Sequence, residues 1–163
     1  MDHFADLAIV FEPVGLNEVQ VLARVRQQVH AVPATDHPLA HKSVLRLGEC
    51  AQFPVGLPTA PYGVRHLIDR ALMGASSQLD IAIGSDNFEF LRRYPTKEHL
   101  VTFQIPIGLP LVDGIDDMIA RPVDTRDIPE DLLYLRQLRG PTLPVAAAKF
   151  AVQLEKVFAT RFD

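Results

Sequence analysis

The segment Gln78–Pro110 constrains the fold more than any other part of the chain. It contains two apolar, strand-like runs, Leu79–Ile83 and Leu100–Phe103, and each run ends in a short polar or Gly/Pro-rich stretch. The first of these stretches, residues 84–87, directly precedes the helix-compatible Phe88–Tyr94. Open α/β sheets hold ligands where strand ends lead into helix starts, because backbone N–H groups there converge on one crevice. The segment therefore predicts an α/β fold with a small-molecule pocket at these strand ends.

Strand-like and helix-like segments alternate along the rest of the chain, which also favours an α/β fold. The clearest amphipathic helix follows Pro61, because apolar residues recur there at helical spacing up to Leu72 and Gly74 follows its end. Residues 142–144 begin a terminal helix, whose expected apolar face consists of Leu143, Ala147, Phe150, Leu154 and Val157. Further strands are expected at 5–11, 51–57, 117–123 and 132–138, and a short helix at 43–47.

The segment 17–32 fits either of two structures. Valines that alternate with polar residues are typical of a strand. Leu22 breaks this alternation, and Asn17 with Gln20 imitates a helix capping box. The β-branched valines favour one long strand.

Composition and charge restrict the classes of protein to which the chain can belong. With 48% hydrophobic and 22% charged residues, the 163-residue chain has an ordinary globular composition. Its net charge of −4 carries no basic footprint, so nucleic-acid binding by this chain is not expected. Cys50 is the single cysteine, which excludes an internal disulfide and favours a reducing cytoplasm, with Cys50 itself a buried, unreactive thiol. No signal-peptide or transmembrane pattern is found, so we expect a soluble cytoplasmic protein.

The sequence contains no clear enzyme or metal motif. The six histidines lack the spacing of metal ligands: His37 and His41 are four residues apart, but Pro38 lies between them and no third ligand type clusters nearby. Glycine-rich phosphate-binding and dinucleotide-binding patterns are missing, as is the Gly-x-Ser-x-Gly pattern of hydrolases. We therefore expect no catalytic residues, no metal and no cofactor.

The start of the helix after Pro61 is the strongest candidate for an anion contact. The N–H groups of Tyr62 and Gly63 lack helical partners there, and the dipole of the helix is positive at this end. The hydroxyl of Thr59 adds a third polar group. The structural alternative is that Thr59 only caps the helix.

Polar side chains also follow the two strands of the segment 78–110. Ser85 and Asn87 offer a hydroxyl and an amide to a ligand, although a helix cap or an Asx turn explains this stretch, and Asp86 above all, without one. Gln104 follows the second strand, so its amide either points into the crevice or bonds neighbouring backbone. Phe11 ends the first strand of the chain, at the other wall of the expected cleft.

Short motifs occur in a characteristic order over nearly the whole chain. They are Asp6–Ile9, Asp36–Ala40, Phe53-Pro54, Arg65, Ile68-Asp69, Thr102–Gln104, Ile107-Gly108, Met118–Pro122, Leu143-Pro144 and Phe150. In this order they resemble the effector-binding domain of LysR-type transcriptional regulators, a relative of the two-lobed periplasmic binding proteins.

The resemblance implies a two-lobed α/β fold of the periplasmic-binding-protein-like type 2, truncated at the N-terminus. Residues 1–32 then form part of lobe I and a crossover strand, residues 33–123 form lobe II, and residues 124–163 return to lobe I through a strand and the C-terminal helix. The segment 17–32 becomes the strand that crosses between the lobes.

The resemblance further implies that the chain senses a small anionic metabolite between its lobes and passes the signal on through rearrangement of an oligomer. It places Thr59, Pro61 and Tyr62 on the pocket side. With the residues above, the expected effector contacts are Phe11, Thr59, Pro61, Tyr62, Gly63, Ser85, Asp86, Asn87 and Gln104. The alternative is a solute-binding protein of a transport system, which a signal peptide or lipobox would indicate. An enzyme on the same fold is a third possibility, which requires an acid–base pair in the cleft.

The sequence departs from the family in two respects. The winged helix-turn-helix with its linker helix is not found, and the first strand–helix–strand of lobe I has no counterpart. Either upstream residues were lost or another chain completes the lobe. Because an unpaired sheet edge favours association, we expect a homo-oligomer, dimeric or higher, with no nucleic-acid or membrane partner for this chain itself.

Overall fold

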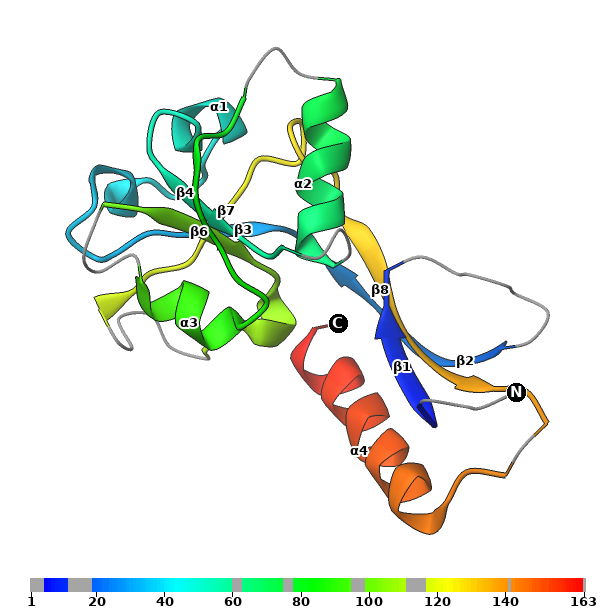
Figure 1. The fold of residues 1–163 in the computed structure, drawn as a ribbon. Coiled ribbons are helices and arrows are strands. Elements are labelled where there is room, and N and C mark those ends of the chain that lie inside the picture. Colours follow the sequence, from blue (N-terminus) through cyan, green and yellow to red (C-terminus); the bar gives the residue numbers. More distant parts are fainter. Residues whose placement is uncertain are drawn as a thin grey trace. The chain divides into compact units, whose positions relative to one another are not determined.

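The computed structural model describes residues 5–11, 19–59, 63–74, 78–94, 99–110, 117–140 and 142–162. It divides the chain into two compact units: unit 1 consists of Met1–Gln27 and Asp131–Asp163, and unit 2 of Gln28–Glu130. The chain therefore passes between the two units twice (Figure 1). The sequence prediction placed the corresponding boundaries before residue 33 and after residue 123.

Unit 1 contains a three-stranded antiparallel sheet and one long helix. In spatial order the strands are β1 (Leu7–Val10), β8 (Asp131–Leu138) and β2 (Val19–Gln27). The pairing of β2 with β8 shifts between Val21 and Ala23. Leu22, which breaks the alternation of the sequence, therefore lies at a β-bulge.

Helix α4 (Val145–Arg161) packs against β2 and β8, with Ala151 and Phe158 as its buried residues. The predicted apolar face is wrong at Phe150 and Val157, whereas Leu143, Ala147 and Leu154 are half-buried. Phe150 is 58% and Val157 39% exposed, and each buried residue lies one position further along the chain. Apolar side chains occur on several sides of this helix, so their spacing alone does not determine which side faces the sheet.

Unit 2 is built on a mixed five-stranded sheet. In this sheet β4 pairs in parallel with both β5 and β6, while β3 is antiparallel to β6 and β7. In spatial order the strands are β5 (Ile81–Gly84), β4 (Val55–Leu57), β6 (Val101–Gln104), β3 (His30–Val32) and β7 (Arg121–Pro122).

The helices of unit 2 connect these strands. Helix α2 follows β4, and its buried residues Val64, Leu67 and Ile68 confirm the helix predicted after Pro61. The helices are η1 (Pro38–His41), α1 (Leu47–Cys50), α2 (Val64–Met73), α3 (Phe88–Arg93) and η3 (Pro106–Gly108).

The long strand predicted over 17–32 is two strands that belong to different sheets. It breaks after β2, at Gln28 and Val29. The Gln28 side chain donates to the Val123 carbonyl at 2.8 Å, and the Val123 N–H donates to the Val29 carbonyl at 2.9 Å. These bonds fix the residues after the break in unit 2. The predicted strand 117–123 is likewise reduced to the two residues of β7.

The helix predicted at 43–47 is wrong, because α1 begins at Leu47. Two carboxylates hold this start. Glu49 Oε2 accepts the Arg46 N–H at 2.9 Å, and Asp127 Oδ2 accepts the Leu47 N–H at 2.8 Å while both Asp127 oxygens bind the Arg46 guanidinium at 2.7 and 2.6 Å. A carboxylate that accepts a backbone N–H at a helix start acts as a cap. Since Asp127 lies 80 residues beyond Leu47, no local pattern reveals it.

The core of unit 2 lies around β4 and β6 and includes Leu57, Ile68 and Phe103. Cys50 is fully buried as well, and burial raises the pKa of its thiol to about 12, which confirms the prediction of an unreactive thiol. None of the described helices is long and apolar enough to cross a membrane.

Candidate functional site

The carboxyl ends of β4, β5 and β6 lie at one edge of the unit 2 sheet, because these three strands are parallel. Thr59 follows β4, Ser85 follows β5, and Gln104 is the last residue of β6. The fold thus brings three predicted site residues from separate segments to the same edge. We call Thr59, Ser85, Asp86, Asn87 and Gln104 the strand-end site.

Asp86 ties the loop after β4 to the loop after β5. Its Oδ1 accepts the Thr59 backbone N–H at 3.0 Å. The Ser85 N–H donates to the Leu57 carbonyl at 3.1 Å, which joins the same two loops. Gly84 permits this close approach, because a Cβ atom there would lie 2.8 Å from Thr59 Cγ2. The Thr59 amide is therefore occupied within the protein, and the site contains a carboxylate.

Ser85 and Asn87 shape the start of α3. The Asn87 N–H donates to Ser85 Oγ at 3.2 Å, and Asn87 Oδ1 accepts the Phe90 N–H at 2.9 Å. The cap and turn that the sequence predicts are thus present. They use the oxygen of each side chain and leave the Ser85 hydroxyl hydrogen and the Asn87 Nδ2 amide without a partner among the described residues.

Gln104 is only 4% exposed and bonds neighbouring backbone. Its Nε2 donates to the Phe88 carbonyl at 3.3 Å, so it links the end of β6 to the first residue of α3. Of the two orientations expected from the sequence, the structure shows the bond to backbone. The remaining polar atom, Oε1, lies on the side of Gly108, 3.6 Å from where a Cβ of that residue would be.

Arg65 is a residue of this region that the sequence analysis did not assign to the site. Its Nη1 donates to the Pro58 carbonyl at 3.0 Å, next to Thr59, and its Nε is held by both carboxylate oxygens of Asp69. The i,i+4 spacing of Arg65 and Asp69 on a helix was the available signal. Arg65 therefore brings a positive charge to the loop after β4.

The remaining predicted contacts are placed as follows. Gly63 is the N-cap of α2 with φ +64°, a backbone conformation that glycine adopts without strain. Pro61 and Tyr62 lie outside the described residues. Phe11 belongs to unit 1, where it is 6% exposed. Within the described parts of the chain, no three His, Cys, Asp or Glu side chains are grouped to hold a metal ion.

The strand-end site offers both hydrogen-bond donors and acceptors. The Ser85 hydroxyl and the Asn87 amide can donate, Gln104 Oε1 can accept, and the Thr59 hydroxyl, which has no partner among the described residues, can do both. These are side chains suited to binding a ligand. They do not form an acid–base pair or an activated nucleophile.

Comparisons with known proteins agree with this geometry. The family model described as the LysR substrate binding domain matches residues 2–151. The chain belongs to this family. A comparison with curated protein sequences finds no match. Because the LysR family consists of transcriptional regulators, a solute-binding protein of a transport system is not favoured.

Solved structures of LysR regulators share the fold. The CcmR regulatory domain of Synechocystis PCC6803 in complex with 2-PG has a TM-score of 0.74 and 17% identity, over 97% of this chain and 76% of that one. The effector-binding domain of QuiR in complex with shikimate has a TM-score of 0.72 and 17% identity, over 97% of this chain and 74% of that one. For HinK of Pseudomonas aeruginosa the TM-score is 0.70 and the identity 18%, over 94% of this chain and 52% of that one.

These similarities confirm the predicted fold, the α/β fold of periplasmic-binding-protein-like type 2. They also confirm the family to which the motif order pointed. This chain spans about half the length of the HinK regulator.

Proposed function

We propose that this LysR substrate binding domain senses a small-molecule effector at the strand-end site, on behalf of a transcription regulator. The observation that carries the proposal is the convergence of three parallel strand ends that present polar groups with unused hydrogen-bonding capacity. The CcmR and QuiR domains, which share this fold, are complexes with 2-PG and shikimate. The contribution of unit 1 residues such as Phe11 to the same effector stays a prediction from the sequence.

The mixture of donors and acceptors favours an effector that carries hydroxyl groups. A hydroxyl both donates and accepts, so it can satisfy the Asn87 amide on one side and Gln104 Oε1 on the other. A ligand with acceptors only would leave Gln104 Oε1 without a donor from the ligand. We therefore infer a hydroxylated metabolite.

An anionic group on this effector is a further part of the proposal. The Thr59 N–H does not support it, because Asp86 accepts that hydrogen bond. The cation that the described bonds bring to the site is Arg65, which donates to the Pro58 carbonyl and is paired with Asp69. In the proposal, an anionic group of the effector shares this guanidinium with Asp69.

Effector binding is proposed to shift the conformational equilibrium of the domain, and an oligomer of regulator subunits is proposed to transmit this shift. A ligand changes such an equilibrium only by its differential affinity for the two states. The coupling between an effector and a distant site is typically about 1–3 kcal/mol. In this proposal the effector is released chemically unchanged, because the domain does not act as an enzyme.

The test uses Thr59→Val combined with Ser85→Ala. Bound small molecules are first selected from a cell metabolite extract and identified by mass spectrometry, and their affinity is then measured by calorimetry. Loss of two hydroxyl contacts should weaken binding about tenfold or more, at about 1 kcal/mol for each hydrogen bond. The bound molecule should be recovered unchanged.

The matched control is Thr142→Val combined with Ser43→Ala, which removes the same atoms at exposed positions of the structure. It should bind like the unmodified chain. If the site variant bound the effector as tightly as this control, the effector would bind elsewhere. If the bound molecule were recovered chemically altered, the domain would be an enzyme.

A further inference from the structure

Gly84, the last residue of β5, lies against the side chain of Thr59. A Cβ atom at residue 84 would come within 2.8 Å of Thr59 Cγ2, which is too short for a Cβ contact. The next nearest atom, the Leu57 carbonyl oxygen, would be 3.9 Å away, an ordinary contact. Gly84 also lacks the positive φ that favours glycine. The glycine is therefore needed here to make room for the Thr59 methyl.

Hydrogen bonds fix the backbone on both sides of this contact. Asp86 Oδ1 accepts the Thr59 N–H at 3.0 Å, and the Ser85 N–H donates to the Leu57 carbonyl at 3.1 Å. The Thr59 side chain itself is exposed, so it can turn more readily than the two loops can separate. A side chain at residue 84 is therefore expected to rotate Thr59 about its Cα–Cβ bond. Rotation to the next staggered position moves the Thr59 hydroxyl by about 120°.

We propose that Gly84 is a positioning residue of the strand-end site, a role that rests on the function proposed for this site. The methyl and the hydroxyl of Thr59 are two branches of one carbon atom, so seating the methyl against Gly84 sets the direction of the hydroxyl. The hydroxyl has no partner among the described residues that could orient it instead. An effector thus meets a hydroxyl that is already held in one orientation, which lowers the entropy lost on binding.

Serine and valine at residue 59 would each lack half of this arrangement. A serine keeps the hydroxyl but has no methyl, so its oxygen can turn into the space beside Gly84. A valine keeps the methyl but has no hydroxyl. The combination of Thr59 with Gly84 therefore supplies an oriented hydroxyl, and the effect of a change at one residue should depend on the other.

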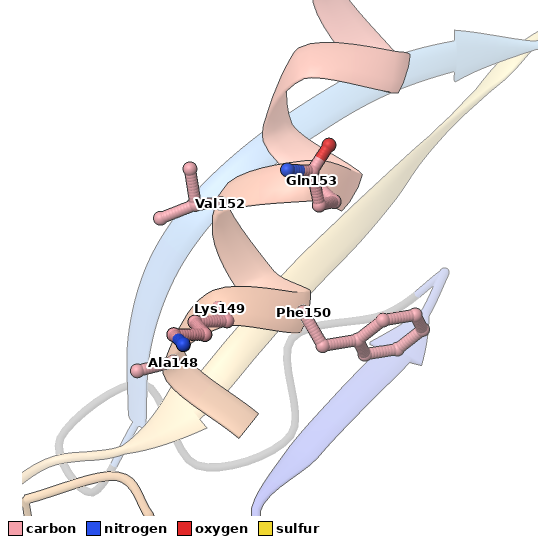
Figure 2. A pocket seen from close by; sticks show the side chains of 5 residues that line it. All are labelled: Ala148, Lys149, Phe150, Val152 and Gln153. Carbon is pink, nitrogen blue, oxygen red and sulfur yellow. The ribbon is translucent and has the colours of Figure 1, made fainter. Parts of the chain in front are cut away.

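A shallow hollow on helix α4 of unit 1 is the alternative place for a small molecule. In Figure 2, Phe150 extends from this helix on the side away from Val152. The described residues that line the hollow all belong to α4 and are Ala148, Lys149, Phe150, Val152 and Gln153. Binding at this hollow depends on Phe150 and is independent of Gly84.

The orientation of Thr59 is tested first by NMR of the labelled chain without any ligand. Three-bond couplings from Thr59 Cγ2 to its backbone nitrogen and carbonyl carbon report the rotamer. The unmodified chain should show one rotamer, and Gly84→Ala should shift Thr59 to another or to an average of several. The couplings of the exposed Thr142 should be the same in both proteins.

A cell metabolite extract is the probe for binding, and mass spectrometry of a dilution series measures how tightly the retained molecules are bound. Gly84→Ala should weaken their retention about fivefold, the effect of one lost hydrogen bond. In the Thr59→Ser background the same change should not weaken retention, because serine has no methyl to meet the new Cβ atom. A merely structural role of Gly84 would weaken retention equally in both backgrounds.

Gly74→Ala is the matched control, because it adds the same methyl after α2, where the nearest atom would be the Ala71 carbonyl oxygen at 3.9 Å. It should change neither the Thr59 couplings nor retention.

Unchanged Thr59 couplings in Gly84→Ala, or an equal loss of retention in the threonine and serine backgrounds, would overturn the proposal. Retention that is lost in Phe150→Ala and kept in Gly84→Ala would place the molecule at the hollow of α4 and overturn it as well. If the unmodified chain retained no molecule, the proposed function would fail, whereas the couplings would still decide whether Gly84 orients Thr59.

Discussion

In unit 2, every residue of β4 and β6 is buried, whereas β1 of unit 1 has no buried residue at all. The sequences do not explain this difference, because the LAIV of β1 is more apolar than the VTFQ of β6. The position in the sheet explains the difference: β6 lies between β4 and β3, whereas β1 has one neighbour, β8, among the described strands. An apolar run therefore indicates a strand suited to burial, but it does not show that the same chain supplies the cover.

The largest effect is expected when one phenylalanine ring is removed from each unit, which compares a buried apolar residue of unit 2 with an exposed one of unit 1. Phe103 in β6 is 1% exposed, and Phe150 in α4 is 58% exposed. Phe103→Ala should lower the free energy of unfolding by about 3–5 kcal/mol, because it leaves a cavity in the core. Phe150→Ala should change it by no more than about 0.5 kcal/mol.

Urea denaturation at low protein concentration measures both variants, so that self-association does not contribute. Similar losses for Phe103→Ala and Phe150→Ala would show that α4 is covered in the free chain. In that case the apolar residues of unit 1 and unit 2 would not differ in burial.

A smaller loss of stability is expected when the hydrogen bonds between the start of α1 and the loop before β8 are removed. Asp127→Ala removes the acceptor of the Leu47 N–H and both bonds to Arg46. The loss should be about 1–2 kcal/mol, as for other helix caps. Thermal unfolding measures it, with Asp80→Ala as control, because the exposed Asp80 side chain has no partner among the described residues. Equal melting temperatures for the two variants would show that this tie does not stabilise unit 2.

His37 is a fully buried histidine of unit 2 that is held in its neutral form. Its Nδ1 accepts the Leu39 N–H at 3.1 Å, so Nε2 carries the proton and donates to the His99 carbonyl at 3.1 Å. Burial, followed by the nearby His99, lowers the pKa of His37 below its ordinary value of 6.5, although the His99 carbonyl and Asp36 oppose this shift. Protonation of Nδ1 breaks the bond to Leu39.

The smallest expected effect is the pH dependence that follows from this pKa. The unfolded chain takes up a proton at His37 as the pH falls through 6.5, and the folded chain does so only at a lower pH. Stability should therefore be constant above this pH and fall below it, by at most about 1.4 kcal/mol per pH unit. His37→Gln should flatten this part of the stability profile, whereas His41→Gln, at an exposed position, should not. If stability depended on pH in the same way in His37→Gln and His41→Gln, the conclusion that folded His37 is neutral would be contradicted.

The sequence predicts most of the framework, because short apolar runs and helical spacing are local signals. The runs that became β5, β6 and β8 and the helix α2 were identified within a few residues. The helix at 43–47 was wrong for the opposite reason, since a carboxylate 80 residues away helps to hold the start of α1. The predicted apolar face of α4 was wrong at Phe150 and Val157, because apolar residues occur on several sides of that helix.

For the strand-end site, the residue types were predictable and their bonding was not. Parallel strands ending in Thr59, Ser85 and Gln104 follow from the order of strands and helices. That Asp86 takes the Thr59 amide depends on a contact between two loops 27 residues apart. The same holds for Arg65, because its bond to the Pro58 carbonyl depends on how α2 is placed against the loop after β4.

The central claim is that the strand-end site holds the effector, and nitrogen-15 NMR of the chain tests it most directly. The small molecule selected from a cell extract is titrated into labelled protein, and both backbone and side-chain amide signals are followed. Binding at the site predicts the largest shifts at the Asn87 Nδ2 amide and at the backbone amides of Thr59 and Ser85. Saturable binding that leaves these signals unchanged and shifts residues of α4 instead would contradict the account.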